Sequence, residues 1–160
     1  MSTTTLFLSW CHEDRHLKEA FVRLLTPNLK IVKGHDFSWW EDSLITPGEE
    51  WEDEINAHLG ESDYVVQLLS PGFLASDFIR DHEIPGIGKT PDKRTLPVML
   101  VNVPLNGSYE FHGINKRQIF LSRRGRPRAF DELSSGAARR QFVTDFTDAL
   151  VKRLEAGGTR

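Results

Sequence analysis

The chain has 160 residues, about the length of one domain, and its 39% hydrophobic and 27% charged residues are typical of a globular protein. The formal net charge of −3 argues against direct binding of nucleic acid and against attachment to an anionic membrane. The single cysteine, Cys11, excludes an internal disulfide. Residues 1–16 lack the pattern of a secretion signal, and no apolar stretch reaches the roughly 20 residues that span a bilayer. We therefore expect a cytoplasmic protein.

The first half of the chain predicts a strand followed by a helix. Residues 5–10 form a short apolar run, which is typical of a buried strand. Leu17, Phe21, Leu24 and Leu25 then repeat at helical spacing, and Pro27 with the following Asn is expected to end that helix. A second strand has two candidates, residues 29–32 and residues 37–40, and the sequence does not decide between them.

The remaining elements continue this alternation. Residues 46–49 read as a capping box that opens a helix ending at Gly60. Strands are predicted over residues 64–69, 96–101 and 118–121, and an amphipathic helix carrying Phe142, Phe146 and Leu150 follows. We expect one domain over residues 1–155 and a linker-like tail over residues 156–160, leading to a sensor domain.

Strands that alternate with helices predict an α/β fold, a three-layer sandwich around a central, mainly parallel, five-stranded sheet. Sites in such sheets form beyond the carboxyl ends of the strands. The segments to search are therefore residues 9–12, 41–51 and 70–83.

Three short patterns suggest chemistry that their surroundings do not support. His12 and His16 frame an H-E-x-x-H pattern, but the helix can begin only near Glu13 or Asp14, so His12 lies in the preceding turn and a zinc hydrolase is disfavoured. Residues 86–90, GIGKT, end like a phosphate-binding loop but lack its first glycine and its preceding strand. Cys11 beside His12 lacks a third residue that would orient a thiol nucleophile.

Four segments, in this order and spacing, resemble the TIR domain of the bacterial, NAD-cleaving type across residues 5–155. They are LFLSWCHEDRHLKEAF, WWEDSLITPGEEWEDEI, DYVVQLLSPGFLASDFIRDHEI and TLPVMLVNVPL. The resemblance implies the flavodoxin-like TIR fold. It also implies an NAD+ glycohydrolase that cleaves the bond between nicotinamide and ribose, with NAD+ as substrate and no cofactor or metal. The product would be ADP-ribose or a cyclic isomer of it.

In this family the essential glutamate lies on the helix after the third strand, and Glu83 occupies the matching position. His82 would match if no residue were inserted, but a histidine cannot supply the negative charge. Many members carry a Trp four residues before the glutamate, where this chain has Ile79. A single carboxylate suffices for the reaction, because nicotinamide leaves as a neutral molecule and the ribosyl cation is what needs stabilisation.

The resemblance also implies a set of residues that line the NAD+ cleft. Ser9 and Trp10 match the end of the first strand, and Ile79 lies near the glutamate. Trp51 matches an aromatic residue that stacks on the dinucleotide, although packing in the core explains it equally well. Asp42 begins the BB loop, which runs from Asp42 to Gly48 and gates the cleft.

The same resemblance implies self-association, with the BB loop of one subunit docking on its neighbour. Charge suits such a contact, since residues 41–63 hold nine acids and no Lys or Arg, while residues 115–128 hold six bases and no acid. We expect an oligomerisation-activated effector of bacterial anti-phage immunity. The alternative is a non-catalytic adaptor that uses these surfaces only for contacts between TIR domains.

Overall fold

The computed structural model describes residues 2–41, 61–76, 94–116 and 118–158. The regular elements within these ranges are four strands, three α-helices and three short 3-10 helices. In chain order they are β1 (Ser2–Ser9), η1 (His12–Asp14), α1 (Arg15–Lys30), β2 (His35–Glu41), β3 (Tyr64–Leu69), α3 (Pro71–Ala75), β4 (Arg94–Met99), η4 (Ile114–Lys116), η5 (Phe130–Glu132) and α5 (Gly136–Gly158). Of the two candidates for the second strand, the later one is correct, because residues 29 and 30 belong to α1.

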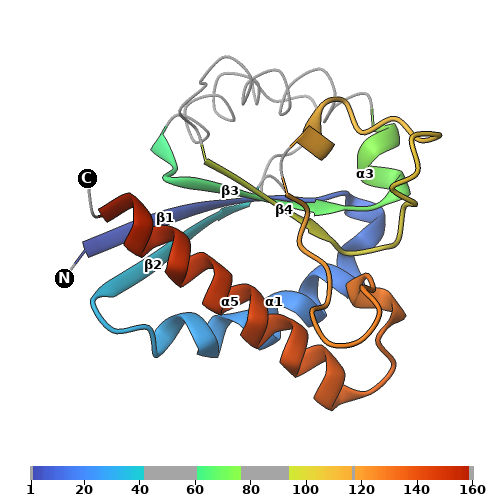
Figure 1. Ribbon diagram of the computed structural model, residues 1–160. Helices are drawn as coiled ribbons and strands as arrows, with labels where there is room; N and C mark the ends of the chain where they lie inside the picture. Colours follow the sequence, from blue (N-terminus) through green and yellow to red (C-terminus); the bar gives the residue numbers. More distant parts are fainter. Residues whose placement is uncertain (1, 42–60, 77–93, 117, 159–160) are drawn as a thin grey trace.

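The four strands form one parallel sheet in the order β2-β1-β3-β4 (Figure 1). Strands β1 and β3 lie in the middle, and every residue of β3 is buried, which explains its mainly apolar sequence, interrupted only by Gln67. Because all four strands are parallel, their carboxyl ends meet at the same edge of the sheet. The predicted α/β fold with a parallel sheet and flanking helices is confirmed.

The predicted fifth strand over residues 118–121 is reduced to one isolated bridge between Val98 and Phe120. Phe120 N–H donates to the Pro97 carbonyl at 2.8 Å, and Met99 N–H donates to the Phe120 carbonyl at 3.0 Å. The next bond of this ladder would need an N–H at Pro97 to donate to the carbonyl of residue 118, and proline has none. Proline at this edge position therefore stops the pairing from extending toward residue 118, and on the other side Ser122 N–H donates to the Arg128 carbonyl instead of to β4.

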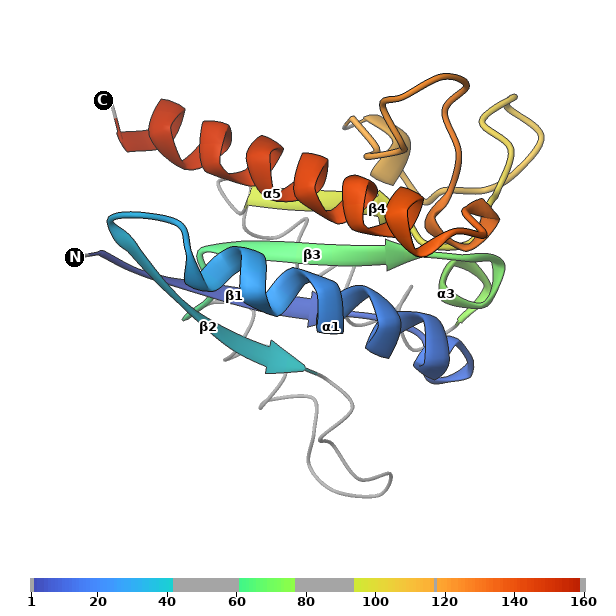
Figure 2. The same cartoon turned by 90° about the horizontal axis from the view of Figure 1, so that it is seen from below.

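Helices α1 and α5 cover one face of the sheet and lie side by side across it (Figures 1 and 2). Alternate residues of the strands, such as Leu6 and Leu8, point into the core beneath these helices. The core is rich in phenylalanine: the rings of Phe21, Phe120, Phe130, Phe142 and Phe146 contact one another edge to face, with centroids 5.1–6.3 Å apart.

A second, smaller apolar cluster lies around the carboxyl ends of β3 and β4, and α3 and the segment after β4 contribute to it. Its buried members are Leu69, Phe73, Leu74, Met99, Val103, Phe111, Ile114 and Ala129. Helix α3 has five residues, and η4 has three. The described members of this cluster therefore come from strand ends, short helices and turns.

Helix α1 begins where the sequence predicts but ends later. Pro27 lies inside it, and the helix continues to Lys30. Two side chains support the backbone around the proline: Thr26 Oγ1 donates to the Val22 carbonyl at 2.8 Å, and Asn28 Nδ2 donates to the Leu24 carbonyl at 2.9 Å. Leu29, only 4% exposed, holds the last turn in the core. Packing therefore outweighs the helix-breaking effect of the proline.

The C-terminal helix is longer than predicted. Helix α5 continues to Gly158, so residues 156–158, predicted to be linker-like, are helical. The domain limit at residue 155 and a following sensor domain stay predictions. Among the described residues, no helix combines the length and the apolar character that a membrane span requires.

Candidate functional site

The candidate site lies at the carboxyl edge of the sheet, where the chain leaves β1 and β3. The turn after β1 runs through Cys11 into η1, and the turn after β3 begins at Ser70 and enters α3. Both turns are held at one edge because β1 pairs with β3 in parallel, with Ser9 opposite Gln67. In open parallel sheets this edge is where ligands bind.

Ser9 is the last residue of β1 and is fully buried. Strand alternation places it on the face of the sheet opposite to Leu8, which packs beneath α1 and α5. Its Oγ has no hydrogen-bond partner within the part of the chain that the structure describes. Because Ser9 Oγ is itself fully buried, it is not open to a ligand in this structure, and its contact with NAD+ stays a prediction.

Trp10 is placed differently from the expectation of a ring lining the cleft. It is 1% exposed and belongs to the core beneath α1 and α5. Lys18 Nζ lies 4.5 Å from the centre of its ring, and the His12 ring lies 5.2 Å away, centre to centre. Packing and a cation–π contact thus account for Trp10 in this structure, and its contact with NAD+ stays a prediction.

A hydrogen bond between Ser70 and Asp14 joins the two turns of the site. Ser70 Oγ donates a hydrogen bond to Asp14 Oδ2. Ser70 Oγ also accepts a hydrogen bond from the backbone N–H of Phe73 at 3.0 Å. Ser70 is the N-cap of α3, with Pro71 at the first helical position, so its hydroxyl completes the cap while holding the carboxylate of Asp14. The start of α1 is thereby tied to the start of α3.

The two turns also approach closely at Gly72. A methyl group at this position would lie 3.1 Å from both Cys11 Sγ and Glu13 Oε2. These distances are shorter than ordinary contacts to a β-carbon, so a larger residue would push the turns apart. Glycine here allows the segment after β1 to pack against α3.

The partly buried carboxylate of Asp14 and the exposed carboxylate of Asp131 lie in a negatively charged setting at this edge. Burial raises the pKa of Asp14, with a further rise from Glu13, while the hydrogen bond from Ser70 opposes it. Burial also raises the pKa of Asp131, helped by Glu132 and by Asp14, and opposed mainly by a hydrogen bond from the backbone of residue 102. The edge therefore favours cationic or proton-donating ligand groups over anionic ones near Asp14.

Several predicted site residues lie outside the described ranges. They are the proposed catalytic Glu83, its neighbour Ile79, the competing His82, Trp51, and Asp42 with the rest of the BB loop. The GIGKT segment and the capping box at residues 46–49 also lie outside them. The structure thus brings together Ser9 and the start of α3, and the other assignments stay predictions.

Sequence reasoning missed the Asp14–Ser70 pair and the nearby Asp131. Asp14 and Ser70 are 56 residues apart, so no local pattern connects them. The signal available was the Ser-Pro pair directly after a buried strand, which is typical of a helix N-cap. Nothing in the sequence around Asp131 indicates that it approaches the same edge.

The turn that carries His12 has the geometry expected from the sequence. His12 lies in η1, and α1 begins only at Arg15, so His12 and His16 do not share one continuous helix as the H-E-x-x-H zinc motif requires. In the described residues, His, Cys, Asp and Glu side chains form no group of three or more that could hold a metal ion.

The fold and sequence are similar to those of known TIR domains. A TIR domain from the crystal structure of the RPS4 and RRS1 TIR domain heterodimer superposes with a TM-score of 0.50 at 17% identity, covering 91% of this chain and 96% of that one. An uncharacterized protein, y4lF of Sinorhizobium fredii, is 30% identical over 81 residues. That match covers 50% of this chain but only 24% of the relative's length.

A comparison with the TIR family as a whole covers more of the chain than the 81 residues matched by y4lF. The sequence model of the TIR domain matches residues 6–134, from the middle of β1 through η5. This span includes all of β3 and the Ser70 cap, and thus both turns of the candidate site. The chain therefore belongs to the TIR domain family.

Proposed function

We propose that this domain is an NAD+ glycohydrolase of bacterial immune signalling, with Glu83 as its catalytic residue. Membership of the TIR family is the observation that carries the proposal, because the family includes NAD-cleaving enzymes. The segment that contains Glu83 follows α3, whose N-cap Ser70 fixes the exit from β3 at the carboxyl edge of the sheet. That is the edge where a dinucleotide binds in folds of this architecture.

The described residues suit the chemistry of this reaction. Cleavage of the nicotinamide–ribose bond develops positive charge on the ribose, and carboxylates in a poorly solvated place stabilise such charge most strongly. Asp14 already supplies a partly buried carboxylate at this edge. In the proposed mechanism Glu83 accepts hydrogen bonds from the ribose hydroxyls and opposes the ribosyl cation, while water or an internal nucleophile completes the reaction.

The test is release of nicotinamide from NAD+ by the purified domain at high protein concentration. Glu83→Ala should lower the rate by about a hundredfold or more, the usual cost of removing a group that stabilises the transition state. Glu155→Ala, which removes an exposed acid near the end of α5, is the matched control and should keep the parent rate. Equal rates in Glu83→Ala and the parent would reject Glu83 as the catalytic residue.

An inactive parent would require one further experiment, because the adaptor alternative predicts no release at all. Fusion to an oligomeric scaffold should switch the enzyme on if activity depends on assembly. Continued absence of nicotinamide release from the assembled fusion would favour the adaptor. Chromatography of the products then separates ADP-ribose from a cyclic isomer.

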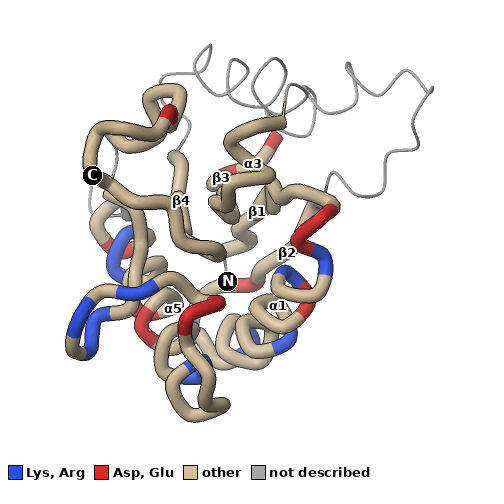
Figure 3. Tube along the Cα trace, turned by 90° about the vertical axis from the view of Figure 1, so that its right-hand side faces the viewer, with Lys and Arg blue, Asp and Glu red and all other residues tan. Residues whose placement is uncertain are grey.

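We also propose that assembly joins the BB loop region of one copy to a basic surface of the next. Figure 3 shows Lys and Arg residues gathered on the loop beside α5, and Arg123, Arg124, Arg126 and Arg128 of this loop are exposed. The partner would be the acidic stretch of residues 41–63. That a TIR domain similar in fold was crystallised as a heterodimer supports pairing between such domains.

Charge reversal tests this contact. Arg123→Glu with Arg124→Glu should weaken self-association in light scattering, because the acidic stretch would meet like charge. Arg23→Glu with Lys30→Glu reverses two exposed charges on α1 and is the matched control. An unchanged mass distribution for the first pair, or an equal loss for both pairs, would reject the proposed contact.

A further inference from the structure

A cavity lined by described residues lies away from the candidate site, between the outer edge of β4 and helix α5. Its volume is about 550 Å³, within the roughly 300–1,000 Å³ typical of small-molecule sites. The segment of residues 118–127 forms its third wall. The limited pairing at Pro97 helps create it, because the chain before Phe120 does not continue along β4 as a strand.

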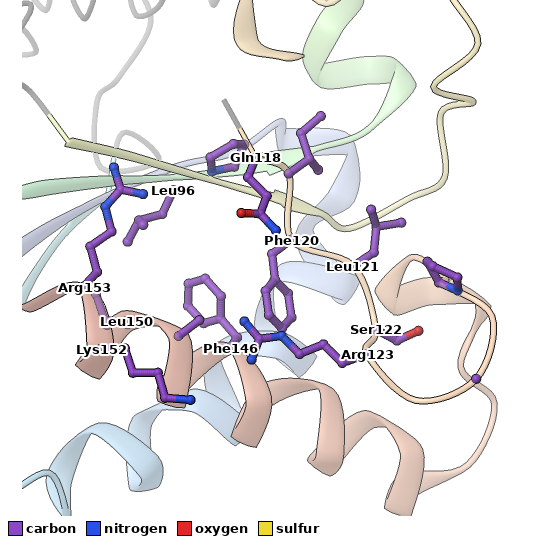
Figure 4. Close-up of a pocket in the computed structure, with 15 residues that line it drawn as sticks. Leu96, Gln118, Phe120, Leu121, Ser122, Arg123, Phe146, Leu150, Lys152 and Arg153 are labelled. Atoms are coloured by element: carbon purple, nitrogen blue, oxygen red, sulfur yellow. The ribbon is translucent and has the colours of Figure 1, made fainter. Parts of the chain in front are cut away.

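The floor of this cavity is apolar and fixed in place. Phe120 contacts the rings of Phe142 and Phe146 edge to face, at 5.1 and 5.4 Å between centroids. Phe146 and Leu150 are 3% and 1% exposed and come from α5, while Leu96 comes from β4. Figure 4 shows the side chains of Leu96, Phe120, Phe146 and Leu150 bordering the cavity. A ligand would thus meet a preformed apolar surface.

The rim of the cavity is cationic. Of the described residues that line it, three are cationic and none is acidic; the cations are Arg123, Lys152 and Arg153. The Arg123 guanidinium lies 5.3 Å from the centre of the Phe120 ring, which orients it, and Lys152 pairs with Asp148 at 3.0 Å in an exposed contact. Gln118 and Ser122 add polar groups to the same lining, and Figure 4 shows the Gln118 amide beside Phe120.

The loop that carries Arg123 is held by internal hydrogen bonds. Ser122 N–H donates to the Arg128 carbonyl at 3.0 Å, and Arg128 N–H donates to Ser122 Oγ at 2.9 Å, which closes the loop on itself. Arg124 Nε lies 3.7 Å from Asp145 Oδ2, and this ion pair joins the loop to helix α5. Arg123 is therefore carried by a hydrogen-bonded turn, while the other two cations of the rim, Lys152 and Arg153, come from α5.

We propose that this cavity binds an amphipathic organic anion, a small molecule with an aromatic or aliphatic body and a phosphate, sulfonate or carboxylate group. The body lies on Phe120, Phe146 and Leu150, and the anionic group meets the cations of α5 and of the 122–128 loop. The site is separate from the proposed NAD+ cleft, so it can be occupied whether or not the domain cleaves NAD+.

The probe for this proposal is 8-anilinonaphthalene-1-sulfonate, whose fluorescence reports its binding, compared with the neutral N-phenyl-1-naphthylamine. The sulfonate should bind at least about tenfold more tightly than the neutral amine, since only the anion engages the rim. Lys152→Ser with Arg153→Ser should weaken sulfonate binding about tenfold and leave the amine unchanged. Arg23→Ser with Lys30→Ser, on the exposed side of α1, is the charge-matched control.

A second variant tests the cavity without changing its charge. Ala149 lines the cavity and is partly exposed, so Ala149→Phe should fill it and abolish saturable binding of both dyes. Thr144→Phe, at an exposed position of α5 outside the lining, should leave binding intact. Circular dichroism confirms that each variant is folded. The proposal fails if neither pocket variant changes the dissociation constant of the sulfonate, or if the two dyes bind the parent equally well.

Discussion

Among the residues that the structure describes, the two sides of the sheet are built in different ways. On one side two long helices, α1 and α5, cover the strands and enclose a cluster of five phenylalanines. The cluster at the carboxyl edge is closed by a five-residue helix, short 3-10 turns and the segment after β4. Long helices bury continuous apolar stripes, whereas short turns place polar side chains such as Ser70 and Asp14 beside a core.

This difference separates stability from chemistry within one domain. The helical side needs only packing, so its residues are apolar and its contacts numerous. The turn side carries the hydrogen bond between Asp14 and Ser70, the close approach at Gly72 and two carboxylates with raised pKa values.

The strongest test of this view is Phe21→Ala. Phe21 is fully buried and its ring contacts three other phenylalanines, so truncation leaves a cavity at the centre of the cluster. We expect a loss of about 3–5 kcal/mol in the free energy of unfolding, measured by chemical denaturation. Phe21→Leu keeps most of the volume and should cost less than half of this. A loss below about 1 kcal/mol for Phe21→Ala would contradict a dominant helical core.

The corresponding truncation in the second apolar cluster, at the carboxyl ends of β3 and β4, is Ile114→Ala. Ile114 is 6% exposed and begins η4 in the second cluster. We expect a loss of about 2 kcal/mol, at the lower end for such truncations, because the short surrounding turns can close over part of the cavity. Proteolysis should then increase in the segment after β4 before the whole domain unfolds. Equal destabilisation by Ile114→Ala and Phe21→Ala would remove the distinction between the two sides.

The smallest expected effect concerns Asp14→Asn, which keeps an oxygen for Ser70 but removes the ionisable group. Since the pKa of Asp14 is raised in the folded state, the folded protein binds its proton more readily than the unfolded chain. Its contribution to stability is therefore fully present below the unfolded pKa and lost as pH rises through the folded pKa.

As pH rises from about 4, the ordinary pKa of an aspartate, the melting temperature of Asp14→Asn should fall less steeply than that of the parent protein. The change should correspond to less than about 1 kcal/mol, because water still reaches the carboxylate. Ser70→Ala offers a comparison, since it removes the opposing hydrogen bond while retaining the titrating group. A steeper decline in Asp14→Asn than in the parent would contradict the direction of the shift.

Much of the fold could be predicted from the sequence because its signals are local. The apolar run of β3 and the helical spacing of Phe21 and Leu25 depend on neighbouring residues, and both were predicted correctly. The continuation of α1 past Pro27 was not predicted, because it depends on the packing of Leu29 into a core formed by distant segments. The shortening of the fifth strand likewise depends on which segment of the chain lies beside Pro97 in the folded protein.

The site was less predictable from the sequence, because most of its contacts join residues that are far apart along the chain. Ser9 at the end of β1 follows from strand polarity, but the burial of Trp10 beneath α1 depends on how that helix lies on the sheet. The pairing of Asp14 with Ser70 spans 56 residues and arises only when β1 and β3 lie side by side.

The proline in β4 also has a consequence for how copies of this protein can meet. An open sheet edge normally invites a strand from another molecule, which is a common route to aggregation. At this edge Pro97 offers no N–H, and Phe120 already occupies the adjacent backbone groups of Pro97 and Met99. A continuous intermolecular sheet is therefore blocked, and molecules that associate here must recognise one another through side chains, in contacts that can form and dissolve reversibly.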